Sequence, residues 1–227
     1  MFARYAVYYT PEIGTPLADF GASWLGWDSA KGVARPHPDL GALDVAAVTE
    51  APRKYGFHGT IKPPFRLAEG TTAQGLSDAL ATLCADASPA RLEGLQLVRL
   101  GRFLAFVPVG EAKALSALAA RCVQELDTFR APPNAAELEK RRAKRLNPAQ
   151  EAHLQRWGYP HVLDQFRFHM TLTGRVDPDT CTQAEIALSS MTQALDLSPL
   201  TINALTLLGE DSAGRFHQIH RYTLTGV

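Results

Sequence analysis

The sequence has no apolar run long enough to cross a bilayer and no excess of charge of either sign. A membrane-spanning helix needs roughly 20 consecutive apolar residues, and no stretch of the 227 residues approaches that length. The 23 basic residues equal the 23 acidic ones, so no overall field marks a nucleic-acid binder. The N-terminal segment also lacks the layout of a signal peptide. These absences predict a soluble, cytoplasmic protein with no membrane partner, and they make RNA a less favoured partner.

Cysteine is scarce. The chain has Cys84, Cys122 and Cys181, an odd number at wide separations. No Cys-x-x-Cys pair and no Cys/His spacing typical of a zinc site occurs. The pattern is typical of buried free thiols in a reducing compartment. We therefore expect no metal site and no cofactor.

Apolar periodicity predicts a mixture of strands and helices. Runs of β-branched and aromatic residues bounded by Gly or Pro indicate strands, and apolar residues at spacings of three and four indicate helices. Pro63 and Pro64 are expected to end the second strand. The order of elements repeats once, which favours an α+β fold with internal duplication. The expected strands are 3–9, 55–62, 92–100, 102–109, 165–175, 201–208 and 215–225, and the expected helices are 16–25, 72–87, 111–129, 135–157 and 178–195.

The most informative feature is a short motif that occurs twice. Phe57–Ile61 and Phe168–Leu172 both consist of Phe-His-x-Thr followed by a branched aliphatic residue, 111 residues apart (169 − 58). Side chains alternate across a strand, so the His and Thr of each copy share one face and the Phe and aliphatic residue share the other. Each motif strand is therefore predicted to have an apolar face toward a core and a polar face toward a cleft.

Two such polar faces suit the cleavage of a phosphodiester. Histidine is neutral or protonated around pH 7, so His58 and His169 are the candidate general base and general acid. The hydroxyls of Thr60 and Thr171 could donate to the phosphate oxygens.

Two cations near the motifs are further candidates for substrate binding. Lys62 lies two residues beyond Thr60, and Arg167 lies two residues before His169, each on the motif face of a regular strand. A solvated strand end is the alternative for Lys62, and a surface charge is the alternative for Arg167.

At this point the sequence resembles the 2H phosphoesterase superfamily, which has two His-x-Thr motifs. The strings YGFHGTIKPPFRL (55–67) and RWGYPHVLDQFRFHMTLTGR (156–175) are most similar to a branch associated with phosphonate-utilisation operons. The resemblance implies one bilobal domain over 1–227, with one motif per lobe (58–60 and 169–171). It also implies a duplicated fold in which two antiparallel sheets flank a central cleft and helices lie outside. The implied activity is that of a metal-independent cyclic phosphodiesterase acting on a small nucleotide or (phospho)ribose.

Several alternatives stay open at the level of sequence. One is an RNA-end-processing, 2′,5′-ligase-like enzyme, and another is a module that binds a phosphorylated metabolite without turning it over. The basic run 140–145 is either a solvated helix face or an arm over the cleft that attracts a phosphorylated substrate. The sequence decides neither the substrate and its product, nor which histidine is the acid, nor the oligomeric state.

Overall fold

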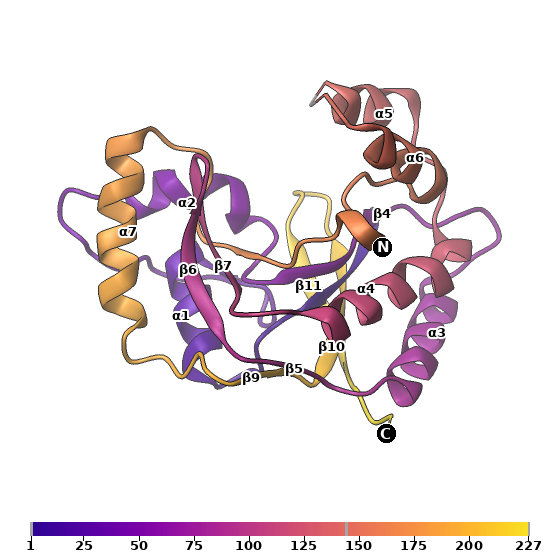
Figure 1. The fold of residues 1–227 in the computed structure, drawn as a ribbon, viewed down its shortest axis with the longest axis horizontal. Helices are drawn as coiled ribbons and strands as arrows, with labels where there is room; N and C mark the ends of the chain where they lie inside the picture. The colour runs from indigo at the N-terminus through magenta and orange to yellow at the C-terminus, as the bar shows by residue number, and fades with distance from the viewer. Residues whose placement is uncertain (1, 144, 227) are drawn as a thin grey trace.

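The computed structural model describes residues 2–143 and 145–226 (Figure 1). The strands are β1 Arg4–Tyr9, β2 Trp27–Asp28, β3 Val33–Ala34, β4 Gly59–Phe65, β5 Ala90–Leu92, β6 Leu95–Leu100, β7 Phe103–Pro108, β8 Met170–Thr171, β9 Leu200–Ile202, β10 Ala204–Glu210 and β11 Phe216–Thr223. The helices are α1 Pro16–Leu25, α2 Val45–Arg53, α3 Ala73–Asp86, α4 Lys113–Glu125, α5 Ala135–Arg142, α6 Pro148–Trp157 and α7 Pro178–Thr192, with short 3₁₀ turns at Asp127–Phe129 and Leu163–Gln165.

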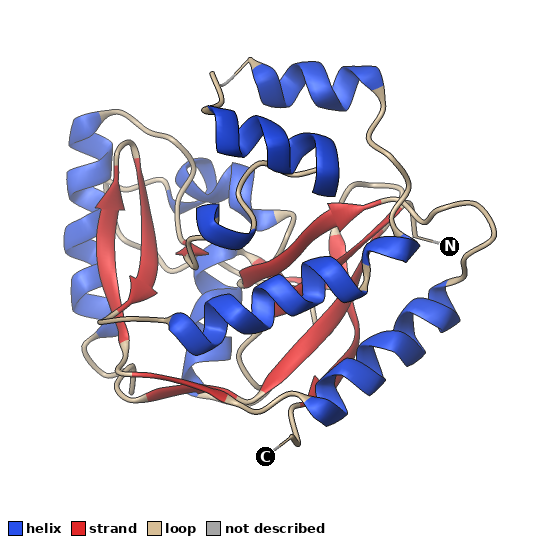
Figure 2. Cartoon of the chain, turned by 45° about the vertical axis from the view of Figure 1, so that its right-hand side comes forward, coloured by secondary structure: helices blue, strands red, loops and turns tan. Residues whose placement is uncertain are grey.

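Seven strands form one antiparallel sheet in the order β11-β10-β1-β4-β8-β7-β6. Figure 2 shows the strands of the chain in red among the helices in blue. Two small sheets, β2-β3 and β5-β9, complete the strand pairing of the described residues. The predicted α+β class with antiparallel sheets is confirmed. The expectation of two separate sheets differs from this arrangement, because β4 and β8 pair at Gly59 and Met170 and so join both motif strands in one sheet.

Five helices pack their apolar sides into one core on one face of the sheet. This core takes buried residues from α1, α2, α3, α4 and α7 together with alternate residues of the strands. The remaining helices, α5 and α6, stand together beyond the end of β4 (Figure 1), and Leu154 is the one buried residue among the described residues of the two. Neither helix contributes a residue to the main core, so α5 and α6 lie outside it.

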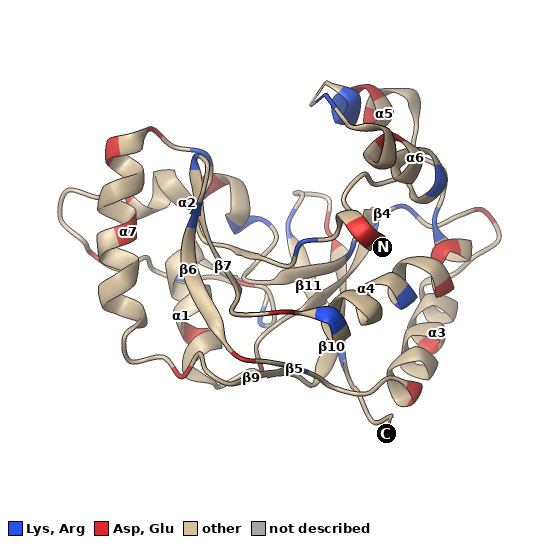
Figure 3. Cartoon of the chain, in the orientation of Figure 1, with Lys and Arg blue, Asp and Glu red and all other residues tan. Residues whose placement is uncertain are grey.

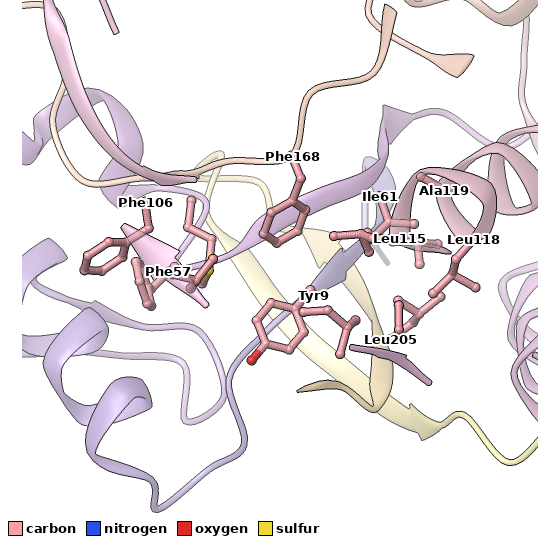
Figure 4. Packing of buried hydrophobic residues seen from close by; sticks show 14 of the residues in the cluster. Tyr9, Phe57, Ile61, Phe106, Leu115, Leu118, Ala119, Phe168 and Leu205 are labelled. Carbon is pink, nitrogen blue, oxygen red and sulfur yellow. The ribbon is translucent and has the colours of Figure 1, made fainter. Parts of the chain in front are cut away.

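The phenylalanines of the two motifs anchor the motif strands in this core (Figure 4). Phe168 lies directly over Gly59, where a Cβ atom would be 2.2 Å from the ring. Phe57 occupies the corresponding space against Gly21 of α1, at 2.1 Å from a Cβ built there. Both rings are 5% exposed. Gly59 is therefore the central residue of its motif because a larger side chain would displace the ring of the other motif.

A β-bulge in β4 changes which way its side chains point. Tyr8 is opposite Thr60 and Val7 is opposite Lys62, so the register shifts by one residue between these pairs. A bulge interrupts the alternation of faces. Lys62 consequently lies with Ile61 on the core side, and both residues are buried.

The strand β4 also continues through Pro63 and Pro64, which were expected to end it. Prolines are tolerated on a strand edge that needs no N–H donor. Because β8 is only two residues long and meets β4 at Gly59, the same edge of β4 has no partner strand further along. The strand therefore extends to Phe65, opposite Tyr5.

Three other elements differ from the sequence prediction. The helix α2 lies in a segment expected to be irregular, and it begins where the Asp44 side chain accepts from the Ala47 N–H at 3.0 Å. The expected helical stretch 135–157 is two helices; the sequence Asn147-Pro148-Ala149-Gln150 predicts a helix start inside it, and the structure confirms that start, with Asn147 as N-cap and Gln150 completing a capping box. The expected strand 165–175 contains only β8. The hairpin of β6 and β7 and the helix α1 are confirmed.

All three cysteines are free and buried, as the sequence predicts. No helix within residues 2–143 and 145–226 is both long and apolar enough to cross a membrane.

We expect Gly59→Ala to destabilise the fold. The added methyl must displace the Phe168 ring, and overpacking of this kind typically costs about 1–3 kcal/mol. The measurement is the free energy of unfolding in urea. Gly75→Ala in α3 is the control, because its nearest neighbours would be 3.3 and 3.4 Å away and alanine favours a helix. A loss no larger for Gly59→Ala than for Gly75→Ala would contradict the packing described here.

Candidate active site

The four polar residues of the motifs lie on the same face of the sheet. Gly59 and Met170, the central residues of the two motifs, are directly opposite each other in the antiparallel pair. Antiparallel register then puts His58 opposite Thr171 and His169 opposite Thr60. Opposite residues point to the same side, so all four side chains point away from the core.

The two imidazoles are held in the same way. In both motifs the Nδ1 atom of the histidine donates to the carbonyl two residues earlier: His58 to Gly56 at 2.8 Å, and His169 to Arg167 at 2.9 Å. A carbonyl can only accept, so Nδ1 carries a proton in each ring and Nε2 is the atom available for proton transfer. In His58 this Nε2 is 3.2 Å from the Thr60 hydroxyl.

Gly56 sets the position of the first imidazole. Its φ of 71° is in the left-handed region, and a Cβ atom there would be 2.6 Å from the Ser29 hydroxyl oxygen. This turn is the reason that the strand begins only at Gly59 rather than at Tyr55. It directs the Gly56 carbonyl to His58 Nδ1.

Aromatic rings surround His58. The Tyr8 ring stacks on the imidazole with 3.8 Å between centroids, and the Tyr55 ring is 5.9 Å away. Burial lowers the pKa of His58 to about 4, with the nearby charge of His169 acting in the same direction and the Gly56 hydrogen bond opposing it. His58 is therefore neutral at pH 7. Burial also raises the pKa of Tyr8, so its hydroxyl keeps its proton.

A cavity of about 370 Å³ opens beside His58. Its charged lining residues are the cations Arg4, Arg141 and Arg175, and no carboxylate occurs among the described residues that line it. Four aromatic residues complete much of the wall. The cavity therefore offers an anion positive charge and flat apolar surface together. The motif and aromatic residues lining it are His58, Thr60, Thr171, Tyr8, Tyr55, Phe103 and Tyr159.

His169 lines an adjacent cavity of about 310 Å³. Thr60, Pro63 and Tyr159 line both cavities, so the two are contiguous at these residues. The structure thus brings His58, Thr60, His169 and Thr171 together around two contiguous cavities, with Thr60 lining both.

The two expected cations have different positions. Arg167 is exposed and lines the cavity that contains His169; its guanidinium donates to the carbonyls of Asp164 at 3.0 Å and Phe166 at 2.7 Å. Lys62 was expected on the motif face and is not there. It is 2% exposed, and its Nζ donates to the Val123 carbonyl at 3.0 Å. Burial lowers the pKa of this amine to about 8, an effect that Asp127 at 3.9 Å opposes.

Sequence patterns alone did not single out Arg4, Tyr8 and Tyr159 as site residues. Tyr8 is on the opposite face of β1 from Tyr5, Val7 and Tyr9, and alternation along that strand is the signal that separates it from them. Arg141 belongs to the basic run 140–145. Its guanidinium carbon lies 4.4 Å from the Tyr159 ring centroid, and both residues line the cavity beside His58.

Within the part of the chain that the structure describes, no three His, Cys, Asp or Glu side chains are grouped so that they could hold a metal ion.

The fold and site define an α+β protein with paired histidines in a cationic cleft. The chain belongs to the family described as "protein of unknown function (DUF1045)", which it matches over residues 60–217.

Two curated proteins named "Ribose 1,5-bisphosphate phosphokinase PhnN" are similar to this chain. The protein from Janthinobacterium sp. (strain Marseille) is 38% identical over 218 residues, covering 93% of this chain and 48% of its own length. The protein from Laribacter hongkongensis (strain HLHK9) is 34% identical over 184 residues, covering 77% of this chain and 40% of its own length. The chain thus spans about half the length of these relatives, or less.

Solved structures offer only distant likenesses. A phosphoesterase is 14% identical, with a TM-score of 0.43 and 99% of each chain covered. E. coli LigT in its apo form is 16% identical, with a TM-score of 0.41 and 99% of each chain covered. TM-scores below 0.5 do not establish a common fold.

The low pKa of His58 predicts how stability depends on pH. Between the folded pKa near 4 and the ordinary value of 6.5, the unfolded chain binds the proton that the folded protein excludes. The free energy of unfolding should therefore decrease as the pH falls from about 6.5 to about 4, by roughly 2–3 kcal/mol. Urea unfolding at several pH values measures this decrease.

His58→Gln should remove that contribution, and Tyr8→Phe should retain it because the ring stacked on His58 is kept. If wild type and His58→Gln lose stability equally over this range, the decrease comes from other groups and the prediction is wrong.

Proposed function

We propose that this protein is a metal-independent phosphoesterase that hydrolyses a cyclic phosphodiester of a small nucleotide or phosphoribose. One observation carries the proposal: two imidazoles held identically by backbone carbonyls through Nδ1, so that Nε2 of each is directed to the motif face, with a threonine opposite, around a cavity whose charged residues are all cationic. Hydrolysis of a phosphodiester needs a base, an acid and a site for the phosphate oxygens, and these residues can supply all three.

We assign His58 as the general base. It is neutral at pH 7, and Nε2 is its unprotonated nitrogen because Nδ1 donates to Gly56. That atom can accept a proton from a water molecule as the water attacks phosphorus. His169 is then the general acid, which donates the proton on its Nε2 to the departing sugar oxygen. The Arg167 carbonyl accepts from Nδ1 in the protonated form as well, so it can orient the imidazolium.

Thr60 and Thr171 are proposed to bind the non-bridging phosphate oxygens. Each hydroxyl lies across the strand pair from the histidine of the other motif. Negative charge increases on those oxygens in the transition state, so donors already in place favour it over the ground state. Arg4, Arg141 and Arg175 add positive charge around the same space, and Arg167 does so beside His169.

The two halves of the sheet are proposed to be two lobes of a duplicated domain. The strands β11, β10, β1 and β4 would belong to one lobe, and β8, β7 and β6 to the other. Support comes from the matching positions of the motifs, whose central residues pair with each other, and from the matching hydrogen bonds of the histidines.

The choice of phosphoribose draws on the curated relatives. Their name refers to a ribose bisphosphate, and this chain resembles about half of each protein or less. We infer that this part acts on a related phosphorylated ribose. The sequence resemblance to a branch associated with phosphonate-utilisation operons supports a role for such a substrate in phosphonate metabolism.

We expect His58→Ala and His169→Ala each to lower kcat for a 2′,3′-cyclic nucleotide by about 10²–10⁴, the usual contribution of a general acid or base. Turnover in the wild type should persist in excess chelator. Phosphorus NMR of the products measures both the rate and which ester bond is broken.

His220→Ala is the matched control, because His220 is exposed on β11 and lines neither of the contiguous cavities. The proposal fails if metal-free wild type hydrolyses no 2′,3′-cyclic nucleotide or ribose cyclic phosphate. A thermal-shift gain with such a compound that is recovered unchanged would favour a non-catalytic binding module instead.

A further inference from the structure

Besides the two contiguous cavities that contain His58 and His169, a further cavity of about 350 Å³ adjoins the candidate active site. We call it the second cavity, because it lies outside the space around the histidines. It lies between the end of β4, the residue Lys54 that follows α2, and the last turn of α5. Arg4, Tyr55, Pro64 and Arg141 line both this cavity and the one beside His58. The two cavities are therefore contiguous at these residues.

The lining of this second cavity has a large excess of positive charge. Among its described residues, Glu137 is the one carboxylate. The cationic residues are Arg4, Lys54, Arg66, Arg130, Lys140 and Arg141. A cavity with this balance attracts anions although the chain as a whole has no net charge.

Part of this charge is neutralised by ion pairs and part is not. Arg66 pairs with Glu137 at 3.0 Å, Arg130 pairs with Asp127 at 2.8 Å, and Arg4 pairs with Glu210. In contrast, Lys54, Lys140 and Arg141 form no ion pair with a carboxylate in the described part of the chain. These three cations are available to a ligand.

The paired residues also fix the cavity wall. Glu137 accepts from Arg66 and from the backbone N–H of Asn134, so it ties the first turn of α5 to the end of β4. The basic last turn of α5 is then held above the end of β4 (Figure 3). The wall of the cavity is therefore in place before an anion binds.

Tyr55 connects this cavity to the histidine. Its ring centroid is 4.9 Å from the Lys54 Nζ and 5.9 Å from the His58 ring. Lys54 and His58 therefore both lie next to the same aromatic ring, which separates the lysine from the imidazole.

We propose that the second cavity is a subsite for a phosphate monoester carried by the substrate. The substrate then has two phosphates: the cyclic diester, cleaved between His58 and His169, and a terminal monoester bound by Lys54, Lys140 and Arg141. This inference rests on the proposed function and narrows it, because it makes the terminal phosphate the feature by which the protein selects its substrate.

The first test compares kcat/KM for adenosine 2′,3′-cyclic phosphate with and without a 5′-phosphate. Charge-assisted hydrogen bonds to a phosphate should make the wild type prefer the 5′-phosphorylated compound by roughly tenfold or more. In Lys54→Gln/Lys140→Gln this preference should fall to about twofold or less.

The control is Lys31→Gln/Lys113→Gln, which removes two positive charges from lysines that are 57% and 83% exposed and line neither cavity. It should keep the full preference. A wild type without preference, or equal loss in the two double variants, would overturn the subsite.

The second test separates the subsite from the proposed reaction. Calorimetric titration with adenosine 5′-monophosphate and with adenosine measures binding without turnover. The monophosphate should bind at least tenfold more weakly to Lys54→Gln/Lys140→Gln than to the wild type or the control. If neither cyclic compound is hydrolysed but this difference is found, the reaction is wrong and the subsite stands; equal affinities reject the subsite itself.

Discussion

The pairing of Gly59 with Met170 is the constraint on which the rest of the site depends. It is the one residue pair that links β4 to β8, and it puts the central residues of both motifs opposite each other. The Phe168 ring then lies in the space that a side chain at residue 59 would take. Packing on the core face of the sheet therefore stabilises the same strand register that brings the histidines and threonines together on the other face. One backbone contact thus fixes both histidines and both threonines relative to one another.

Sequence patterns predict correctly which face of the strand His58 and Thr60 share, but they predict less well what surrounds these residues. Alternation along a strand places His58 and Thr60 correctly, because it requires regular backbone over only three residues. It fails for Lys62, since a bulge adds one residue to β4 after Thr60. The sequence prediction also ends β4 at the prolines, although prolines can continue a strand whose edge has no partner. It does not include the helix at residues 45–53, which begins after the N-cap Asp44. These features depend on tertiary neighbours, which apolar periodicity does not contain.

The electrostatics of the cleft come from selective pairing and not from net charge. Several cations near the site are matched by carboxylates, as Arg4 is by Glu210 and Arg66 is by Glu137. Others form no ion pair with a carboxylate in the described part of the chain, and they lie on α5 and beside Tyr55. Meanwhile the tyrosines around His58 shield part of its ring from water, and this burial lowers its pKa. The same small region therefore attracts an anion and keeps an unprotonated nitrogen ready beside it.

The position of β1 in the sheet has a consequence for how the cleft is assembled. This strand contributes Arg4 and Tyr8 to the cleft wall, yet it pairs with β10, about 200 residues further along the chain. Such non-local pairing gives a high contact order, which slows folding. Until β10 has been synthesised, β1 therefore has β4 as a neighbour but lacks its second neighbour in the sheet, although both motifs are already present in the growing chain.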